Sequence, residues 1–225
     1  MTDTIHARSD RPSRARRVLP ARDLAQIAIF AALIAALGLA GPLNIGPVPI
    51  TLQSMGVMLA GAILGPRKGT LALLLFLALT AVGLPLLAGG RGGIGPFTVS
   101  PAAGYLYGWL LGAFVIGHLT ARLMPKYPFW PALGATILGG IGAVYLLGIP
   151  VMAFNLGLPL WTAASLNVAF IPGDLIKVVV TVLVAGQVHR AYPGLIARIG
   201  RPRNPADAGS TTGSASTTGS TSTTA

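Results

Sequence analysis

The sequence contains no cysteine and very little charge. Only 9% of its 225 residues are charged, whereas soluble globular domains carry roughly a quarter charged residues. Without cysteine, the chain has no disulfide bonds, thiol chemistry or thiolate metal sites. A water-soluble fold needs a polar surface that this composition does not supply, so the composition favours a membrane protein.

The motifs of common catalytic and metal sites are also missing. The chain has no Walker A sequence and no HExxH or Ser/His/Asp arrangement. Its three histidines are dispersed, without the spacing of metal ligands: His6, His118 and His189. We therefore expect no enzymatic activity, no cofactor and no metal ion.

Basic residues outnumber acidic ones and give a formal net charge of +11. In a soluble protein this excess would suggest a nucleic-acid partner. Here the basic residues form short clusters between apolar segments, which is typical of the cytoplasmic loops of membrane proteins. The pattern therefore predicts the lipid bilayer, and not nucleic acid, as the surroundings of this chain. Of its five acidic residues, only Asp174 lies inside the apolar body.

Several apolar segments are long enough to be membrane helices, since about 20 apolar residues cross roughly 30 Å of hydrocarbon. The candidate segments are 24–41, 53–65, 69–87, 102–121, 129–149 and 173–188. The second is short, and it suffices only if other helices surround it or if it begins within 42–53. The first follows a long polar arm, so we expect it to be a retained helix and not a signal peptide. The sequence thus predicts an all-α, polytopic membrane protein with six transmembrane helices.

The distribution of Lys and Arg predicts that both termini are cytoplasmic. If six spans alternate, all Lys and Arg residues except Arg91 and Lys177 fall on one side, the cytoplasmic one. We expect residues 1–23 to form a disordered basic arm and 24–190 a single six-helix transmembrane domain. Residues 191–225 would be a cytoplasmic tail, disordered from about 204, where Ser, Thr, Gly and Ala predominate.

The connections predicted on the outer side are long, apolar and rich in Gly and Pro. They are residues 42–53, 88–101 and 150–172. Irregular backbone at membrane depth is tolerated only where protein or a cavity covers it. These segments therefore favour a lid over a pocket near the outer surface, with re-entrant packing segments as the alternative.

Asp174 and Lys177 are the ionisable residues inside the apolar body. They are three residues apart, so a helix places them on one face, and ionisable groups inside membrane spans normally mark a functional site. The alternative is structural: Asp174 follows Pro172-Gly173 and would cap the helix, while Lys177 would extend to the interface. Spacing alone leaves both interpretations open.

The segment 89–96 has five glycines in seven residues around Arg91. Glycine allows the backbone to approach a ligand closely, here at Gly90, and Arg91 is the one cation of the external loops. The strand-to-helix context of a phosphate loop is absent. A flexible external hairpin is the alternative interpretation.

Two further groups of residues are candidates for contacts. Gln53, Tyr105 and Asn167 are polar residues that could line a pocket, although packing or interfacial anchoring would also explain them. Small residues every four positions give the first span a smooth face for close helix packing: Ala28, Ala32 and Ala36.

In four segments the chain resembles the BioY family, the biotin-specific substrate-binding subunits of energy-coupling-factor (ECF) vitamin importers. The segments are Val48-Pro49-Ile50-Thr51-Leu52-Gln53, Gly83-Leu84-Pro85 leading into Gly89-Gly90-Arg91-Gly92-Gly93, Gly104-Tyr105-Leu106, and Pro172-Gly173-Asp174-Leu175-Ile176-Lys177. Their order and the membrane topology make the resemblance specific over residues 24–190.

The resemblance implies a plasma-membrane transport subunit with a vitamin pocket near the outer face, under the first outer loop and the glycine-rich loop. It implies that the family's Asp-xx-Lys pair is Asp174 and Lys177. It also implies partners, namely an ECF transmembrane coupling subunit that meets Ala28 and Ala32, with Ala36 extending the row, and two ATPase subunits.

Biotin has a ureido group, an apolar thioether ring and a carboxylate tail. On this resemblance we expect Asp174 to accept a ureido N–H, Lys177 to support the carbonyl or keep Asp174 ionised, and Arg91 to neutralise the carboxylate. If biotin enters tail first, Lys177 and Arg91 exchange roles. The alternatives are a stand-alone biotin facilitator or oligomer, and a non-transporting scaffold subunit of a membrane complex.

Overall fold

The computed structural model describes residues 19–44 and 46–196. This part of the chain is helical, without named strands. Its elements are α1 (Ala21–Gly38), α2 (Gln53–Ala81), α3 (Gly95–Thr98), α4 (Ala103–Leu123), α5 (Phe129–Ile137), a π-helical segment (Leu138–Ala143), α6 (Val144–Leu156), α7 (Leu160–Asn167), a 3-10 turn (Val168–Phe170) and α8 (Ile171–Ala191). Within the described residues, five continuous helical stretches are long and apolar enough to cross a membrane. The predicted all-α membrane fold is confirmed.

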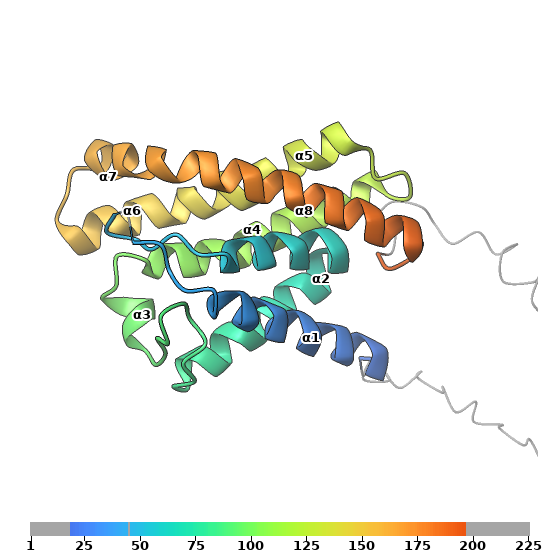
Figure 1. Ribbon diagram of the computed structural model, residues 1–225, viewed down its shortest axis with the longest axis horizontal. Helices are drawn as coiled ribbons and strands as arrows, with labels where there is room; N and C mark the ends of the chain where they lie inside the picture. The colour runs from blue at the N-terminus through green and yellow to red at the C-terminus, as the bar shows by residue number, and fades with distance from the viewer. Residues whose placement is uncertain (1–18, 45, 197–225) are drawn as a thin grey trace, which may run out of the picture.

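α2 consists of two helices that meet at a sharp reversal. Gly65 has a left-handed backbone conformation (φ +78°) and is followed by Pro66, so the chain turns back on itself there (Figure 1). We call residues 53–64 the first arm and residues 66–81 the second arm of α2. With this division the five stretches contain six helices that match the six predicted spans.

The first arm of α2 is enclosed by protein, as its shortness required. All residues from Gly56 to Gly65 are buried. The two arms touch closely, because a Cβ atom on Gly69 would lie 2.6 Å from the carbonyl oxygen of Ala60. Glycine at this position lets the second arm lie directly against the backbone of the first.

The predicted fifth span is one helical stretch from α5 through the π-helical segment to α6. Two of its glycines allow neighbouring helices to approach it closely. A Cβ on Gly139 would lie 2.8 Å from the carbonyl oxygen of Gly112 in α4, and one on Gly140 would lie 2.6 Å from Cε of Met58 in α2. Gly142 has no such neighbour. Small residues therefore bring α4 and the first arm of α2 against this stretch.

Several boundary predictions are wrong, among them the end of the third span, which is Ala81 and not residue 87 because the chain turns at Gly83 (φ +110°). The segment 150–172 is not an irregular loop, because α6 continues through Pro150 to Leu156 and α7 follows after the left-handed Gly157. In an apolar setting the backbone must satisfy its own hydrogen bonds, which favours helix over loop. The first helix runs 21–38 and not 24–41, since it includes the polar turn at Asp23 and ends before the left-handed Gly41.

The helices form a bundle whose two ends differ in character. α1 and the second arm of α2 lie on one side and α8 on the other, with α4 and the first arm between them (Figure 1). We call the end with residues 40–44, 46–52, 82–102 and 157–159 the loop end. The opposite end, the basic end, carries Arg67, Lys68, Arg122, Lys126 and Arg190.

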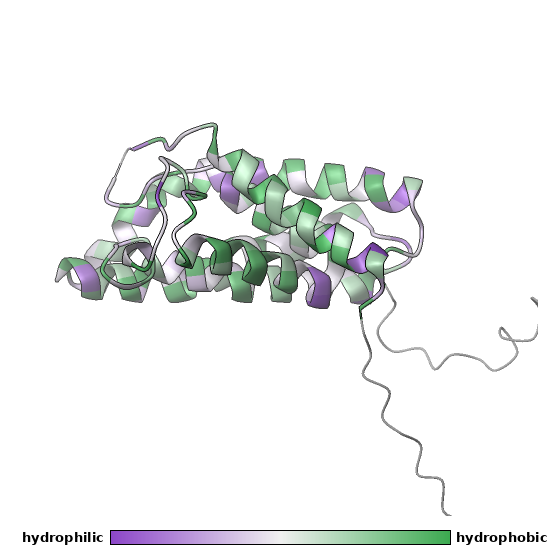
Figure 2. Ribbon diagram, turned by 90° about the horizontal axis from the view of Figure 1, so that it is seen from below, coloured by the Kyte–Doolittle hydropathy of each residue, from purple (hydrophilic) through white to green (hydrophobic). Residues whose placement is uncertain are grey.

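The lateral surface of the bundle is apolar, as Figure 2 shows for its helices. Large side chains such as Leu74, Leu146, Phe154 and Leu183 are between 46% and 86% exposed. A contiguous apolar surface of this kind needs lipid around it. Which end faces the cytoplasm stays a prediction from the positive-inside pattern. The disordered arm predicted for 1–23 is wrong at its end, because residues 21–23 belong to α1. Residues 1–18 of that arm and the tail from about 204, also predicted to be disordered, lie outside the described residues.

Candidate binding site

A cavity of about 80 Å³ lies near the loop end of the bundle. Its wall contains Val48, Pro49, Ile50 and Thr51 from the connection between α1 and α2. The connection between α2 and α4 supplies residues between 87 and 102. The remaining wall comes from the first arm of α2, α4, the π-helical segment, α6, the 3-10 turn and α8. Two of the three predicted outer connections thus supply several residues to the cavity wall, whereas 150–172 supplies only Phe170 of the 3-10 turn.

Asp174 and Lys177 form a buried ion pair on the wall of this cavity. Lys177 Nζ donates to Oδ1 of Asp174 at 3.0 Å and to Oγ of Ser54 at 3.0 Å. The other carboxylate oxygen, Oδ2, accepts a hydrogen bond from the hydroxyl of Tyr145 at 2.8 Å. Three helices, the first arm of α2, α6 and α8, therefore meet through one polar network.

These contacts argue against the interpretation of the pair as a helix cap and an interfacial lysine. The start of α8 has no side-chain cap, and the hydrogen bonds of Asp174 are with side chains. Lys177 is only 7% exposed, so it does not extend to the membrane interface. A buried pair of this kind retains unused lone pairs and one ammonium proton facing the cavity, which suits a neutral ligand with both donors and acceptors.

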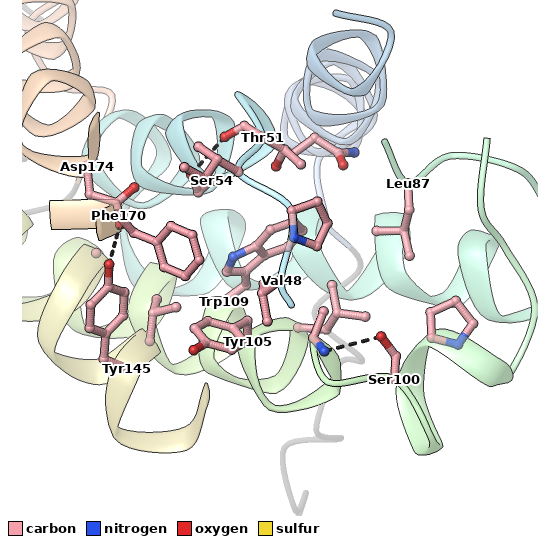
Figure 3. Close-up of a pocket in the computed structure, with 18 of the residues that line it drawn as sticks. Val48, Thr51, Ser54, Leu87, Ser100, Tyr105, Trp109, Tyr145, Phe170 and Asp174 are labelled. Carbon is pink, nitrogen blue, oxygen red and sulfur yellow. Dashed lines mark hydrogen bonds between the residues drawn. The ribbon is translucent and has the colours of Figure 1, made fainter. Parts of the chain in front are cut away.

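Aromatic side chains line the middle of the cavity. Tyr105 and Trp109 come from α4 and Phe170 from the 3-10 turn before α8. Figure 3 shows their rings between Asp174 on one side and Leu87 on the other. Apolar walls with a few polar groups at one end are typical of small-molecule sites.

Asn167, predicted to line the pocket, supports the wall from behind. It is 1% exposed, and its Oδ1 accepts a hydrogen bond from the Tyr105 hydroxyl while its Nδ2 donates to the carbonyl oxygen of Ala163 at 2.8 Å. Asn167 is not among the residues that line the cavity. It fixes the orientation of Tyr105, which does line it.

Gln53 lies at the cavity and also ties three segments together. Its Nε2 donates to the carbonyl oxygens of Ile34 and Leu86 at 3.1 and 2.9 Å, and its Oε1 accepts from the backbone N–H of Ala88 at 2.9 Å. Both amide protons are therefore used by the protein. A ligand would find one lone pair of Oε1 and no donor at this residue.

Arg91 lines the cavity and is exposed, which places it at the opening. Its Nε donates to the carbonyl oxygen of Ala88 at 3.2 Å, and the remaining guanidinium donors are available to an anion. Gly90 is not among the lining residues; its left-handed conformation (φ +70°) belongs to the turn between Leu87 and Arg91. Gly90 thus shapes the loop that presents Arg91.

Tyr145, Ser54 and Trp109 also line the cavity, although none of them was predicted as a site residue. Tyr145 and Ser54 are polar residues within predicted apolar spans, and a buried hydroxyl needs a partner, so this was an available signal. Trp109 carried no signal, because an aromatic residue in a membrane helix is as readily explained by packing.

The alanines predicted to meet a partner lie on one accessible face of α1. Ala28, Ala32 and Ala36 are exposed, whereas Ile27, Ala31 and Ile34 on the opposite face are buried. The face is therefore open to another helix.

The sequence profile of the BioY family matches residues 9–194. The chain belongs to the BioY family. It is 53% identical to a biotin transporter BioY of Rhodobacter capsulatus over 193 residues, covering 79% of this chain and 98% of that protein. It is 48% identical to a biotin transporter BioY of Rhizobium etli over 187 residues, with the same coverage of both chains.

This BioY protein is also similar to a solved structure, the S-component for biotin from an ECF-type ABC transporter. The two share 38% sequence identity with a TM-score of 0.72, over 75% of this chain and 91% of the other. The fold of the helical bundle is thus that of an ECF S-component.

Proposed function

We propose that this BioY protein is the biotin-binding subunit of a vitamin importer in the plasma membrane and has no enzymatic activity of its own. The observation that carries this proposal is the buried network of Asp174, Lys177, Ser54 and Tyr145 at the end of an aromatic cavity. The names of its relatives and of the solved S-component support biotin as the ligand.

The network suits the ureido group of biotin. A ureido N–H donates to a free lone pair of Asp174, and the ureido carbonyl accepts the remaining Lys177 proton. The thioether ring then lies against Trp109 and Phe170, where an apolar ring displaces water from aromatic surface. In this orientation the carboxylate reaches Arg91 at the opening; in the reversed orientation Lys177 takes the carboxylate instead.

Transport requires partners, for which the exposed face of α1 offers a surface. Ala28, Ala32 and Ala36 would pack against the transmembrane coupling subunit of an ECF complex, whose two ATPase subunits supply the energy. The positive-inside pattern supports a cytoplasmic basic end and an outward loop end. Biotin would then be captured from outside under the two loops and released inside after the subunit moves within the complex.

Titration calorimetry with purified protein tests the ligand and its orientation together. Wild-type protein should bind biotin tightly. A free biotin concentration about a hundredfold above Kd should raise the free energy of unfolding by about 2.7 kcal/mol. Arg91→Ala should weaken biotin binding by about tenfold, as for a lost charge-assisted hydrogen bond, and leave binding of biotin methyl ester unchanged. Unchanged affinity of Arg91→Ala for both ligands contradicts the placement of the carboxylate at Arg91.

Uptake measurements test the need for partners. Labelled biotin should enter cells that express this protein only when a coupling subunit and its ATPases are present. Uptake without any coupling subunit would instead identify a stand-alone facilitator. If the purified protein does not bind biotin at all, the alternative of a non-transporting scaffold subunit is favoured.

A further inference from the structure

A second cavity lies at the basic end, far along the bundle from the first. It has a volume of about 1040 Å³ and lies between the start of α1, the reversal of α2 and the segment 194–196. Its wall contains three cations and one carboxylate: Arg22, Arg67, Lys68 and Asp23. The proposed biotin site shares none of these residues.

Lys68 holds the wall of this cavity together. Its Nζ donates to Oε1 of Gln26 at 2.7 Å, to Oδ1 of Asp23 at 3.3 Å and to the carbonyl oxygen of Leu195 at 3.4 Å. The one carboxylate is therefore neutralised by Lys68, and the three donors of the ammonium group are used. Both side chains are partly buried, with exposed fractions of 18% for Lys68 and 28% for Asp23.

Because the charges of Lys68 and Asp23 cancel, Arg22 and Arg67 give the cavity a net positive charge. Neither forms an ion pair with any residue of 19–44 or 46–196, and both are exposed. α1 begins at Ala21, beside this cavity, so the positive end of its helix dipole adds to the two guanidinium groups. An anion with several acceptor oxygens would satisfy both arginines, because guanidinium groups bind phosphate oxygens in pairs.

The remaining wall is apolar and opens sideways. Leu71 of the second arm and Phe114 of α4 line the cavity and are 36% and 49% exposed on the lateral surface. This surface faces hydrocarbon in the bilayer. The cavity therefore joins a cationic pocket at headgroup level to an apolar wall that continues into the membrane.

We propose that this cavity binds an anionic phospholipid, with its phosphate between Arg22 and Arg67 and an acyl chain along Leu71 and Phe114. A free phosphate would use the arginines but not the apolar wall, and an acidic protein segment would not require an opening toward lipid. Only a lipid matches both halves of the cavity. Bound there, it would bridge α1 to the reversal of α2 and stabilise the basic end.

Native mass spectrometry and thermal unfolding of the full chain test the proposal, with phosphatidylglycerol as the probe and phosphatidylcholine as the zwitterionic control. The wild-type protein should retain phosphatidylglycerol preferentially and unfold at a higher temperature in its presence. Arg22→Gln/Arg67→Gln should weaken this retention by about tenfold or more, since each cation near an anionic membrane surface contributes to lipid attraction. Arg122→Gln/Arg190→Gln, also at the basic end but outside the cavity, should retain the lipid as the wild type does.

Other outcomes overturn the proposal. Equal retention of the two lipids, or equal losses in the two double variants, would show only a general attraction of the basic end to anionic membranes. Full stabilisation by inorganic phosphate or glycerol phosphate would identify a free-anion site. Biotin affinity should not change in either double variant, so failure here is distinguishable from failure of the proposed function.

Discussion

The Nε2 atom of His189 donates a hydrogen bond to the carbonyl oxygen of Ala62 at 2.9 Å. In a continuous helix this carbonyl would accept the N–H of residue 66, but residue 66 is proline and has no N–H. α8 therefore supplies the donor that the reversal of α2 lacks. The same two helices are joined near the loop end by Lys177 and Ser54, so polar bonds tie α8 to the first arm at both of its ends.

His189→Leu should lower the thermal stability of the protein in detergent. The variant leaves the carbonyl oxygen of Ala62 buried without a donor, which costs about 1–3 kcal/mol. It also removes the packing of the His189 ring on the Tyr127 ring, whose centroid lies 5.0 Å from that of His189. Burial raises the pKa of Tyr127 to about 12, so its hydroxyl stays neutral at any working pH. His118→Leu, which changes a partly exposed ring, is the control. Equal losses in both variants would show that the Ala62 contact does not contribute.

Asp174→Asn and Lys177→Met should each reduce both stability and biotin binding. Removing one member of a buried pair leaves an uncompensated charge, with a cost of about 3–5 kcal/mol. The double variant removes both charges, so its stability without ligand should recover while biotin binding stays lost. Thermal unfolding and titration calorimetry on the three variants measure this separation. Recovery of binding together with stability would mean that the pair is purely structural.

Tyr145→Phe should weaken biotin binding by about tenfold or more while the fold is maintained. The change removes only the hydroxyl that donates to Asp174 at 2.8 Å, and hydrogen bonds to charged groups contribute about 1.5–3 kcal/mol. Tyr107→Phe is a matched control, because the Tyr107 hydroxyl donates to the carbonyl oxygen of Phe97 at an exposed site. Calorimetric titration of both variants should show a loss only for Tyr145→Phe.

Gly69→Ala should destabilise the protein strongly, because its Cβ would lie 2.6 Å from the carbonyl oxygen of Ala60 and push the arms of α2 apart. Gly134→Ala is the control: no atom lies within 4 Å of the added Cβ, and alanine is favoured over glycine in helices by about 1 kcal/mol. The midpoint temperature of thermal unfolding should therefore fall for Gly69→Ala and stay level or rise for Gly134→Ala. The same response in both would contradict the close contact of the arms.

The sequence predicted the all-α membrane fold well, because the length of each apolar segment and the basic residues that flank it can be read without knowing any long-range contact. It also singled out Asp174 and Lys177, which pair on the cavity wall, since a charge in a membrane span is conspicuous wherever it lies. The prediction failed for 150–172, where Pro and Gly suggest a loop in water. In the membrane the backbone must pair internally, so helices persist through Pro150 and break only briefly at Gly157.

The polar network around the site depended on long-range contacts that the sequence did not reveal. Gln53 was predicted as a binding residue and lines the cavity, but its bonds to backbone groups of Ile34, Leu86 and Ala88 arise only when three distant segments meet. Tyr145 lies 29 residues from Asp174 along the chain. No local pattern connects the two, and they meet only because the helical stretch that ends in α6 packs against α8 through α5 and the π-helical segment.

The enclosed first arm of α2 has a consequence for how the protein enters the membrane. Its 12 residues from Gln53 to Leu64 extend about 18 Å at 1.5 Å per residue, well short of the roughly 30 Å hydrocarbon thickness. Such a segment is a poor substrate for independent integration by the insertion machinery during synthesis. It would enter with the second arm as a helical hairpin and reach its final depth only when α4 and α8 have closed around it.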